Sequence, residues 1–418
     1  MAIERTQPPA AAAHRPHAVR RVVILGSTGS VGTQTLDVLN HLNALHAEDR
    51  WPTRYEVLAL AAGRNAEALS AQIRAHRPAH AALAGGALDA PEACRAWLAS
   101  ESQPDPAAAM VRALDLEPGV DLVVASMVGF AGLGATLAAV ERGVDVALAN
   151  KETLVAAGSL VTAIARASGA RLLPVDSEHA GVWQCLSRLD AAPPPMERFA
   201  PQLTRVTLTA SGGAFRDWSS DRIARATPRD ALNHPTWAMG DKVTIDSASL
   251  MNKALELIEA HWLFGLGADR LGALVHRQSI VHALAETVDG SVLAQLASAD
   301  MRGPILHALA WPGIAPARAP RLTLEQLREL TFEEPDLDRF PALTLGFEVI
   351  RREGSAGAVL NAANEVAVEA FLNGQLAFPR IAELARDALD ALGNSPVESL
   401  NDVHAADAGA RRWTAERL

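Results

Sequence analysis

The chain contains little cysteine, with only Cys94 and Cys185 among 418 residues. Two cysteines cannot form the disulfide framework of a secreted protein, so the composition favours a reducing, intracellular compartment. An excess of positive charge is also missing, because the formal net charge is −10. This balance argues against nucleic acid or an anionic membrane surface as a partner.

Long apolar runs of the targeting kind are missing as well. Residues 1–20 are rich in alanine, proline and arginine and have no signal-peptide core, so we expect a disordered extension and a cytoplasmic protein. Residues 122–140 are uncharged and close to the length of about 20 residues that a spanning helix needs. Their valine-rich start and the following glycines instead favour a strand, a turn and a helix, so we expect no membrane segment.

The chain shows a regular alternation of short apolar strands and amphipathic helices over residues 21–171. This alternation predicts an α/β, Rossmann-like domain with a parallel sheet. Residues 172–310 predict a mixed α+β catalytic domain that includes a long helix from about 246 to 264. Residues 311–339 are proline-rich at their start and predict a linker, and residues 340–418 predict a C-terminal helical domain.

A glycine-rich loop joins the first predicted strand to the first predicted helix. It reads ILGSTGSVG and places Gly26, Gly29 and Gly32 three residues apart, as a variant of the dinucleotide fingerprint. Small residues let the backbone approach a pyrophosphate, and the helix N-terminus supplies N–H groups. The alternative is a tight turn without a ligand.

The end of the second predicted strand bears on which dinucleotide binds. An NAD site usually carries an acid there for the ribose 2′-hydroxyl. This strand ends in Gly63, Arg64 and Asn65 instead. A cation suits the 2′-phosphate of NADPH, which we therefore expect as cofactor, and the alternative for Arg64 is an ordinary solvated side chain.

An acidic pair follows the buried run that ends at Val175. If Asp176 and Glu178 continue an extended strand, they share one face, with Ser177 and His179 on the other. Converging carboxylates repel each other unless a cation lies between them, and hard divalent metals prefer such oxygen ligands. The alternative is a helix start with an N-cap aspartate and an acid in its first turn.

The predicted helix near residue 250 offers a third acid. We expect Asp246 or Ser247 as its N-cap, with Asn252, Lys253 and Glu256 on one face. Asn252 and Lys253 then hold an anion while Glu256 faces the metal. The alternative is a solvated surface face.

Two loops complete the candidate site. Residues 211–213, Ser-Gly-Gly, follow a predicted strand and suit a nest of N–H groups for phosphate, or else a simple glycine turn. Residues 233–242, NHPTWAMGDK, combine histidine, tryptophan and methionine between polar flanks. This composition predicts a lid that closes over a ligand and excludes water, and the alternative is a surface loop anchored in the core by Trp237.

Taken together, these stretches resemble the 1-deoxy-D-xylulose 5-phosphate reductoisomerase family of the non-mevalonate isoprenoid pathway. The resemblance runs in the family's order from residue 22 to about 373. Its most specific blocks are LLPVDSEHAGVWQ, HPTWAMGDKVTIDSASLMNKALELIEAHWLF and ALNAANEVAVEAFL. The family often has lysine where this chain has Arg64, which keeps the positive charge.

The resemblance implies an activity, cofactors and an assembly. It implies rearrangement and reduction of 1-deoxy-D-xylulose 5-phosphate to 2-C-methyl-D-erythritol 4-phosphate, with NADPH and a divalent metal, Mn²⁺ or Mg²⁺. The expected partner is a small sugar phosphate, and the expected assembly is a homodimer.

The resemblance also implies roles for individual residues. The metal ligands are Asp176, Glu178 and Glu256, which act with Lys151 in catalysis. The substrate-binding residues are Lys151, Ser177, Glu178, Ser211, His234, Ser247, Asn252, Lys253 and Glu256. The cofactor-binding residues are Thr28, Gly29, Ser30, Val31, Gly63, Arg64, Asn65, Asn150, Glu152 and Gly240, with Met301 near the nicotinamide. The lid carries His234, Trp237 and Met239.

Two other functions compete with this interpretation. A simple NADP-dependent aldehyde dehydrogenase usually needs a reactive cysteine nucleophile, whereas Cys185 lies in an amphipathic helix where a core cysteine is expected. A non-catalytic NADPH-sensing protein has no use for three acids, a lysine and a lid.

Overall fold

The computed structural model describes residues 19–114, 119–187, 194 and 197–418. Of the predicted N-terminal extension, residues 1–18 lie outside this range. Val19 and Arg20 already belong to the first strand, which therefore begins before residue 21.

The N-terminal part is built on a seven-stranded sheet in which every neighbouring pair is parallel. Its strands are β1 (Val19–Leu25), β2 (Arg54–Ala62), β3 (His80–Leu83), β4 (Arg95–Leu98), β5 (Leu122–Ala125), β6 (Asp145–Leu148) and β7 (Leu172–Pro174). Their order is β4-β3-β2-β1-β5-β6-β7, so the chain reverses its direction across the sheet between β1 and β5. In such sheets ligands bind outside the carboxyl ends of the strands at this switch point. The Rossmann-like prediction is confirmed.

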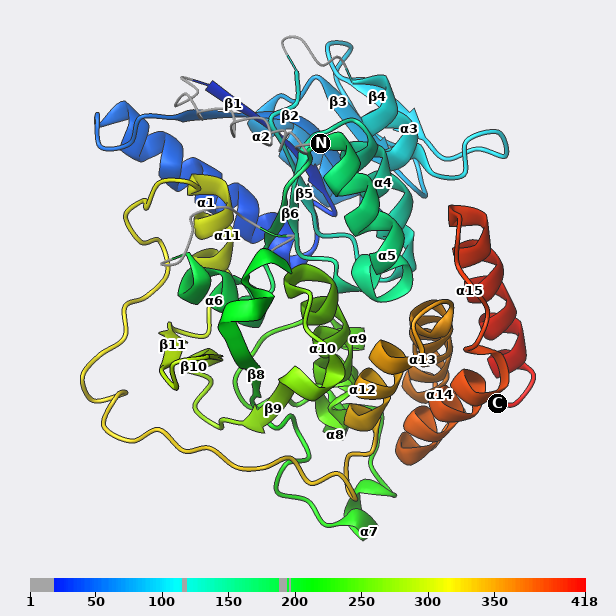
Figure 1. Cartoon of the computed structure of the whole chain (residues 1–418). Helices are drawn as coiled ribbons and strands as arrows, with labels where there is room; N and C mark the ends of the chain where they lie inside the picture. Colours follow the sequence, from blue (N-terminus) through cyan, green and yellow to red (C-terminus); the bar gives the residue numbers. More distant parts are fainter. Residues whose placement is uncertain (1–18, 115–118, 188–193, 195–196) are drawn as a thin grey trace, which may run out of the picture.

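Helices lie on both faces of this sheet (Figure 1). They are α1 (Ser30–Ala47), α2 (Ala66–His76), α3 (Pro106–Ala113), α4 (Leu133–Glu141) and α5 (Lys151–Ser168). Residues 22–25 of β1 are fully buried because helices cover both faces of this central strand. The uncharged run 122–140 forms β5, a loop, the short η1 (Phe130–Gly132) and most of α4, and no helix in the described part of the chain is both long and apolar enough to cross a membrane.

Two details of this sheet differ from the sequence expectation. The edge strand β4 was not predicted, because its four residues, Arg-Ala-Trp-Leu, are mostly exposed and show no apolar run. The last strand, β7, begins at Leu172, where the second domain was expected to begin. The division into domains itself stays a prediction.

A second sheet of four strands lies below the first (Figure 1), in the order β11-β10-β8-β9. Its strands are β8 (Leu203–Ala210), β9 (Leu271–Val275), β10 (Val281–Thr287) and β11 (Val292–Leu296). β8 and β9 are parallel and the other pairs are antiparallel, so the sheet is mixed, as predicted. The elements around it are α6 (Ser177–Leu186), η2 (Glu197–Gln202), α7 (Ser220–Ile223), α8 (Pro228–Ala231), η3 (Ala268–Arg270) and α11 (Arg302–Ala310).

The long helix expected from residue 246 is two helices. α9 (Asp241–Ser249) and α10 (Met251–Phe264) are separated by Leu250, whose φ of 60° lies in the left-handed region and interrupts the helical hydrogen bonds. Asp246 and Ser247 therefore lie inside α9, and the prediction that one of them is an N-cap is wrong. Gly240 occupies the N-cap position of α9 instead.

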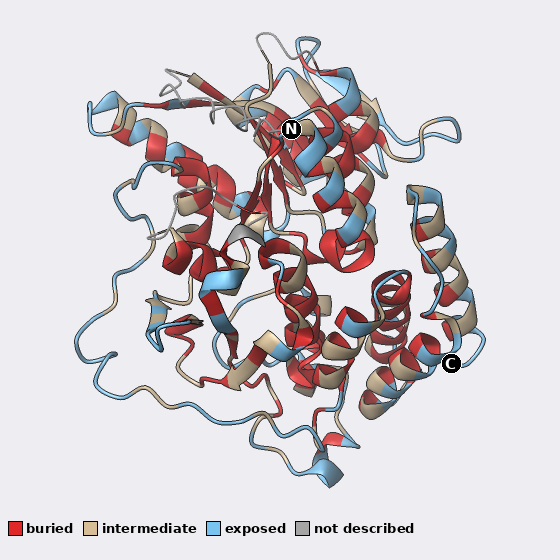
Figure 2. Cartoon of the chain, in the orientation of Figure 1, coloured by how far each residue is buried: buried red, intermediate tan, exposed pale blue. Residues whose placement is uncertain are grey.

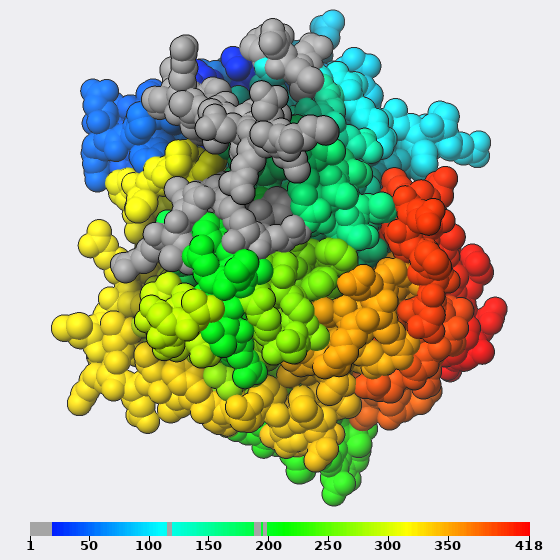
Figure 3. Space-filling view, viewed as in Figure 1, coloured from blue at the N-terminus to red at the C-terminus, as the bar shows by residue number. Residues whose placement is uncertain are grey.

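Residues 311–341 connect the end of α11 to the C-terminal helices across the surface, as the yellow and yellow-orange segment of Figure 3 shows. Apart from an isolated bridge between Val275 and Glu333, these residues form no helix or strand. The C-terminal region consists of α12 (Ala342–Arg352), α13 (Ala356–Leu372), α14 (Phe378–Leu392) and α15 (Leu400–Ala415). Its helical character is as predicted, and α10 and α13 are among the most completely buried helices (Figure 2).

Candidate active site

A cavity of about 370 Å³ lies where the carboxyl ends of the parallel strands face the second sheet. Its walls come from the glycine-rich loop, the first turns of α5 and α6, the lid and the helices α9 and α10. All of the predicted catalytic and substrate residues line it together: Lys151, Asp176, Ser177, Glu178, Ser211, His234, Ser247, Asn252, Lys253 and Glu256.

The acidic pair occupies the start of a helix. Asp176 is the N-cap of α6 and accepts a hydrogen bond from the backbone N–H of Ser177 at 3.0 Å, while Glu178 lies in the first turn. The strand-face interpretation is therefore wrong, and the helix-cap alternative describes the local structure. The two carboxylates nevertheless converge with Glu256 of α10, so that one oxygen from each lies within 4.8 Å of the others.

Two lysines lie against this acidic cluster. The Nζ of Lys151, in the first turn of α5, donates to Oε1 of Glu256 at 2.9 Å and forms an ion pair with Asp176. The Nζ of Lys253 lies 2.6 Å from Oε1 of Glu178 and also pairs with Glu256. With three carboxylates and two ammonium groups, this buried cluster has more acidic than basic side chains.

The charges shift one another's ionisation. Burial favours the neutral acid, yet the ammonium of Lys253 lowers the pKa of Glu178 to about 2. Burial together with the negative charge of Glu178 raises the pKa of Glu256 above its ordinary value. Burial alone disfavours the ammonium of Lys151, but Asp176 and Glu256 outweigh it and keep the pKa well above the usual range.

The donor set fits a hard divalent cation. The three acids offer only oxygen, which is the ligand atom that Mg²⁺ and Mn²⁺ prefer. The side chain of Glu256 is 1% exposed, so its carboxylate is held in place by the protein rather than by solvent. The residues at this site therefore fit the predicted metal.

A second group of possible metal-binding side chains shares Asp176 and lies deeper, with His179 and Glu259. The Nε2 of His179 is 2.8 Å from the backbone oxygen of Glu256, and its Nδ1 is 3.4 Å from Oε2 of Glu259. Burial lowers the pKa of His179 to about 4, so the ring is neutral near pH 7. We interpret this group as support for the turn of α10 that carries Glu256.

Ser211, His234 and Ser247 form one hydrogen-bonded group. The Nε2 of His234 lies 2.9 Å from Oγ of Ser211 and 3.1 Å from Oγ of Ser247. Its Nδ1 accepts from the backbone N–H groups of Thr236 and Trp237, so the proton of the neutral ring is on Nε2. Burial, followed by the charge of Arg216, lowers the pKa of His234 to about 4.

The glycine turn packs closely against this group. Gly212 and Gly213 both have positive φ, and a Cβ on Gly213 would lie 2.3 Å from the backbone oxygen of Ser247. Asn252 and Lys253 were expected to join Ser211 in holding an anion. Here the two side chains point to the acids instead, because Asn252 donates to Glu256 at 2.5 Å and Lys253 pairs with two carboxylates.

The predicted lid lies over the cavity. Its residues between α8 and α9 form neither helix nor strand, and His234, Trp237, Met239 and Gly240 line the cavity. The ring of Trp237 meets His282 edge-on at 6.2 Å, so it contacts the second sheet rather than a deep core. Trp237 is only partly buried, which argues against the alternative of a loop anchored in the core.

The glycine-rich loop is pressed against its neighbours. Gly26 has a φ of +82°, and a Cβ there would lie 2.5 Å from the backbone oxygen of Ser126. A Cβ on Gly32 would lie 2.2 Å from the oxygen of Gly26. Gly29 is the N-cap of α1, and no side chain satisfies the first N–H groups of this helix. An exposed loop of this shape at a helix N-terminus fits a dinucleotide pyrophosphate.

Most of the predicted cofactor residues lie in this loop, after β2 and at the start of α11. Gly29, Ser30 and Val31 line the cavity, as does Met301, and Thr28 is adjacent. Gly63, Arg64 and Asn65 lie outside it, after β2, where the exposed Arg64 is available to a ligand. The side chain of Asn65 accepts from the N–H of Ala68 at 3.1 Å and so caps α2.

Asn150 and Glu152 are engaged with the protein. Asn150 caps α5, and its Nδ2 donates to the backbone oxygens of Met127 and Gly129. Glu152 accepts from Nζ of Lys242 at 2.9 Å. Burial disfavours the carboxylate of Glu152, but the charge of Lys242 outweighs it and lowers the pKa.

Several residues that line the cavity were not predicted. Ser126, Met127 and Val128 follow β5. The rule that ligands bind at the carboxyl ends of parallel strands could have identified them. Lys242 lines the cavity and bridges Glu152 to Asp246, at 2.9 Å from each. Asp246 follows Lys242 by four residues on α9, a spacing that favours such a pair, but Glu152 lies 90 positions away and the local sequence does not indicate that contact.

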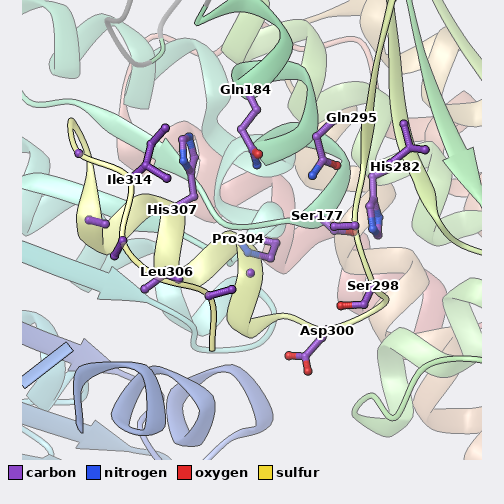
Figure 4. Close-up of a pocket in the computed structure, with 17 residues that line it drawn as sticks. Ser177, Gln184, His282, Gln295, Ser298, Asp300, Pro304, Leu306, His307 and Ile314 are labelled. Carbon is purple, nitrogen blue, oxygen red and sulfur yellow. The ribbon is translucent and has the colours of Figure 1, made fainter. Parts of the chain in front are cut away.

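A second cavity of about 290 Å³ adjoins the first, and Ser177 lines both. Figure 4 shows Ser177 and Gln184, both of α6, on the wall of this cavity, with His282 of β10 and Gln295 of β11 nearby. The hydroxyl of Ser177 donates to Oε2 of Glu178 at 2.5 Å, so this serine belongs to the acidic cluster.

Comparisons with known proteins agree with this geometry. Three family profiles match consecutive parts of the chain. They are described as 1-deoxy-D-xylulose 5-phosphate reductoisomerase (residues 22–158), its C-terminal domain (residues 172–264) and the DXP reductoisomerase C-terminal domain (residues 296–413).

Curated relatives and solved structures carry the same name. The enzyme of Heliobacterium modesticaldum is 46% identical over 96% of this chain and 98% of its own. The enzyme of Ralstonia nicotianae is 46% identical over 94% and 96%. The Zymomonas mobilis enzyme in complex with NADPH has a TM-score of 0.82 and 40% identity, covering 95% of this chain and 98% of that one. A reductoisomerase in complex with NADPH, fosmidomycin and magnesium has a TM-score of 0.82 and 35% identity, with the same coverage.

Proposed function

The chain belongs to the 1-deoxy-D-xylulose 5-phosphate reductoisomerase family, and we propose that it converts 1-deoxy-D-xylulose 5-phosphate to 2-C-methyl-D-erythritol 4-phosphate. The reaction uses NADPH and a divalent metal ion, in line with the ligands named for its solved relatives. The observation that carries the proposal is the convergence of Asp176, Glu178 and Glu256 beside Lys151, in one cavity with the glycine-rich loop.

Each cofactor has a matching set of residues. The three acids hold the metal, while the glycine-rich loop and Arg64 hold NADPH. When bound, the metal polarises the oxygens of the substrate during the carbon–carbon rearrangement, and NADPH supplies the hydride for the reduction. The side chains of this protein bind and orient the substrate, stabilise charge on it and exclude water.

Lys151 has the main electrostatic role. Its ammonium stays protonated at neutral pH, and it lies at the centre of the acidic cluster, bonded to Glu256 and Asn252 at 2.9 Å each. A fixed cation in a buried cavity stabilises negative charge that develops on a substrate oxygen. Ser177, which faces Glu178, orients a substrate hydroxyl.

The phosphate end of the substrate binds about Ser211, His234 and Ser247. These side chains present hydroxyl groups and the Nε2–H of His234 to one place. Asn252 and Lys253 line the same cavity and would complete the anion site. Phosphate binding, away from the reacting carbons, fixes the orientation of the substrate. The lid, with Trp237 and Met239, excludes water during the reaction.

The enzyme works as a homodimer in the cytoplasm. The family resemblance supports the assembly, and the low cysteine content supports a reducing compartment. Light scattering on the purified protein should give twice the mass of one chain, and a monomeric mass at working concentration would contradict the dimer.

The decisive experiment follows NADPH absorbance at 340 nm with 1-deoxy-D-xylulose 5-phosphate, with and without EDTA. Oxidation that stops with EDTA and returns with Mn²⁺ is the expected result. If NADPH is not oxidised with any metal ion, the proposed reductoisomerase activity is contradicted, and an NADPH-sensing protein becomes the better explanation.

An aldehyde dehydrogenase is disfavoured by the cysteines. Cys94 and Cys185 are 6% and 7% exposed, and burial raises the pKa of the Cys94 thiol, whereas a nucleophile needs an accessible thiolate. A thiol-blocking reagent should therefore leave turnover unchanged. Stoichiometric inactivation that substrate prevents would favour the dehydrogenase.

A further inference from the structure

The segment NAANE of α13 matches the family but does not line the cavity. It nevertheless contributes polar side chains to a largely apolar helix, among them Asn361 and Asn364, which are both fully buried. Asn364 donates to Oδ1 of Asp246 at 2.8 Å, and Oε1 of Glu365 accepts from the backbone N–H of Phe130 at 3.1 Å. A helix of the C-terminal region is therefore bonded both to α9 and to the segment that follows β5 of the N-terminal sheet.

The Phe130 contact bears on the cofactor. Residues 126–130 leave β5 at the switch point of the sheet, and the first three of them line the cavity beside the glycine-rich loop. Asn150 bonds the carbonyls of Met127 and Gly129 from one side, and Glu365 bonds Phe130 from the other. Gly129 has a φ of +72°, and a Cβ there would lie 2.7 Å from Oε1 of Glu365, so the approach is close.

Glu365 is itself held by two helices. Asn361 of α13 donates to its Oε1 at 3.1 Å, and Arg411 of α15 donates to its Oε2 at 2.6 Å. His404 of α15 meets the ring of Phe130 edge-on at 5.2 Å. In Figure 1, α15 lies next to α13 and close to the lower ends of α4 and α5. The carboxylate thus has little freedom, and the loop that it bonds shares that rigidity.

We propose that Glu365 is a positioning residue for the dinucleotide: it holds Phe130 and so fixes the loop of residues 126–130 as one wall of the cofactor site. This role rests on the proposed function, because it presumes that NADPH binds at the carboxyl ends of β1 and β5. Among the residues that the structure describes, Glu365 bonds to Phe130, Asn361 and Arg411, and not to Ser211, His234 or Ser247, where the substrate phosphate is proposed to bind. Its loss should therefore affect the cofactor and spare the sugar phosphate.

The test compares three variants with the full-length wild-type enzyme. Glu365→Leu removes both acceptor oxygens at similar size, Glu365→Gln keeps one of them, and Glu369→Leu makes the same change at an exposed position of the same helix. We expect Glu365→Leu to raise the Kd and KM for NADPH by about tenfold, because a hydrogen bond to a charged group is lost. Glu365→Gln should restore most of the affinity, Glu369→Leu should match the wild type, and the KM for the sugar phosphate should stay within about twofold.

A second readout is independent of turnover. Hydrogen–deuterium exchange in a peptide that contains Phe130 should become faster in Glu365→Leu and remain unchanged in Glu369→Leu. A purely structural role would lower the melting temperature or the active fraction and leave the NADPH Kd unchanged, which would overturn the proposal. If Glu365→Leu does not fold, Arg411→Leu frees the carboxylate from its other side, and an unchanged Kd there would also overturn it.

The outcomes separate this proposal from the proposed function. If the wild-type enzyme binds NADPH and Glu365→Leu binds it equally well, only the positioning role is wrong. If the wild type itself binds no NADPH, both the role of Glu365 and the reductoisomerase function are wrong.

Discussion

The Nζ of Lys151 lies 2.9 Å from Oε1 of Glu256, and both side chains are more than nine-tenths buried. One of these residues is expected to bind the metal and the other to act on the substrate. Their contact means that lysine and metal ion compete for the same carboxylate. The two roles can therefore be separated by opposite effects on metal affinity.

Glu256→Gln should weaken metal binding and abolish turnover. The amide keeps the size of the side chain but loses the charge, so we expect Mn²⁺ affinity and kcat each to fall by more than about a hundredfold. Mn²⁺ titration by electron paramagnetic resonance and steady-state kinetics measure the two effects. NADPH affinity serves as the internal control and should change little. A near-normal rate would contradict the three-acid metal site.

Lys151→Met should abolish turnover without weakening metal binding. The substitution removes a cation from the acidic cluster, so Mn²⁺ should bind at least as tightly as in the wild type. Turnover should fall by about a hundredfold or more, because a fixed charge that stabilises the developing oxyanion is lost. The same Mn²⁺ titration checks this outcome. Weaker Mn²⁺ binding than in the wild type would show that Lys151 serves the metal site rather than the substrate.

His234→Ala should raise the KM for the phosphorylated substrate by about tenfold, because the hydrogen-bonded group with Ser211 and Ser247 loses its central donor. Steady-state kinetics with 1-deoxy-D-xylulose 5-phosphate measure the change. The unphosphorylated sugar 1-deoxy-D-xylulose is the matched control, since a phosphate contact cannot affect it. An equal loss with both sugars would place His234 at the reacting carbons or in the lid movement instead.

The sequence predicted which side chains converge at the candidate site better than it predicted their local structure. Asp176 and Glu178 were identified as converging acids, yet they meet because an N-cap and a first turn bring them together, and not because a strand presents them on one face. Similarly, Glu256 was placed on a helix face with the correct neighbours, but Leu250 separates that helix from Asp246. A left-handed residue that is not glycine has no clear signature in a single sequence.

The contacts that support the site were not predictable. The pairs that hold it together join residues far apart in the chain, such as Glu365 and Phe130, which are separated by 235 positions. Periodicity predicts which side of a helix faces the core. It does not predict which distant residue will bond to a polar side chain on that side. For the same reason Lys242 was missed: Asp246 is only four residues away on α9, but Glu152 lies on α5, 90 positions from Lys242.

Arg64→Asp should shift the cofactor preference from NADPH towards NADH. An acid after β2 repels the 2′-phosphate and suits the free ribose hydroxyl, so the ratio of kcat/KM for NADPH to that for NADH should fall by a factor on the order of ten or more. Arg50→Asp makes the same charge change before β2, at the opposite end of the strand, and should leave the ratio unchanged. An unaltered ratio in Arg64→Asp would contradict its role at the 2′-phosphate.

His307 provides a prediction about stability and pH. It lies on α11, lines the second cavity and has a pKa lowered by burial to about 4, against an ordinary value of 6.5. The unfolded chain therefore binds a proton between pH 6.5 and 4 that the folded chain does not bind. It follows that the stability contributed by neutral His307 is complete above pH 6.5 and is lost as the pH falls through this window.

His307→Gln removes this titration. As the pH falls from 6.5 to 4, the free energy of unfolding of the variant should rise relative to that of the wild type by about 1.4 kcal/mol for each pH unit. Urea unfolding of both proteins across this range measures the difference, and comparing the two cancels the other groups that titrate there, including Glu256 and His234. If the difference between His307→Gln and the wild type does not change with pH, the imidazole of His307 is not held neutral by burial.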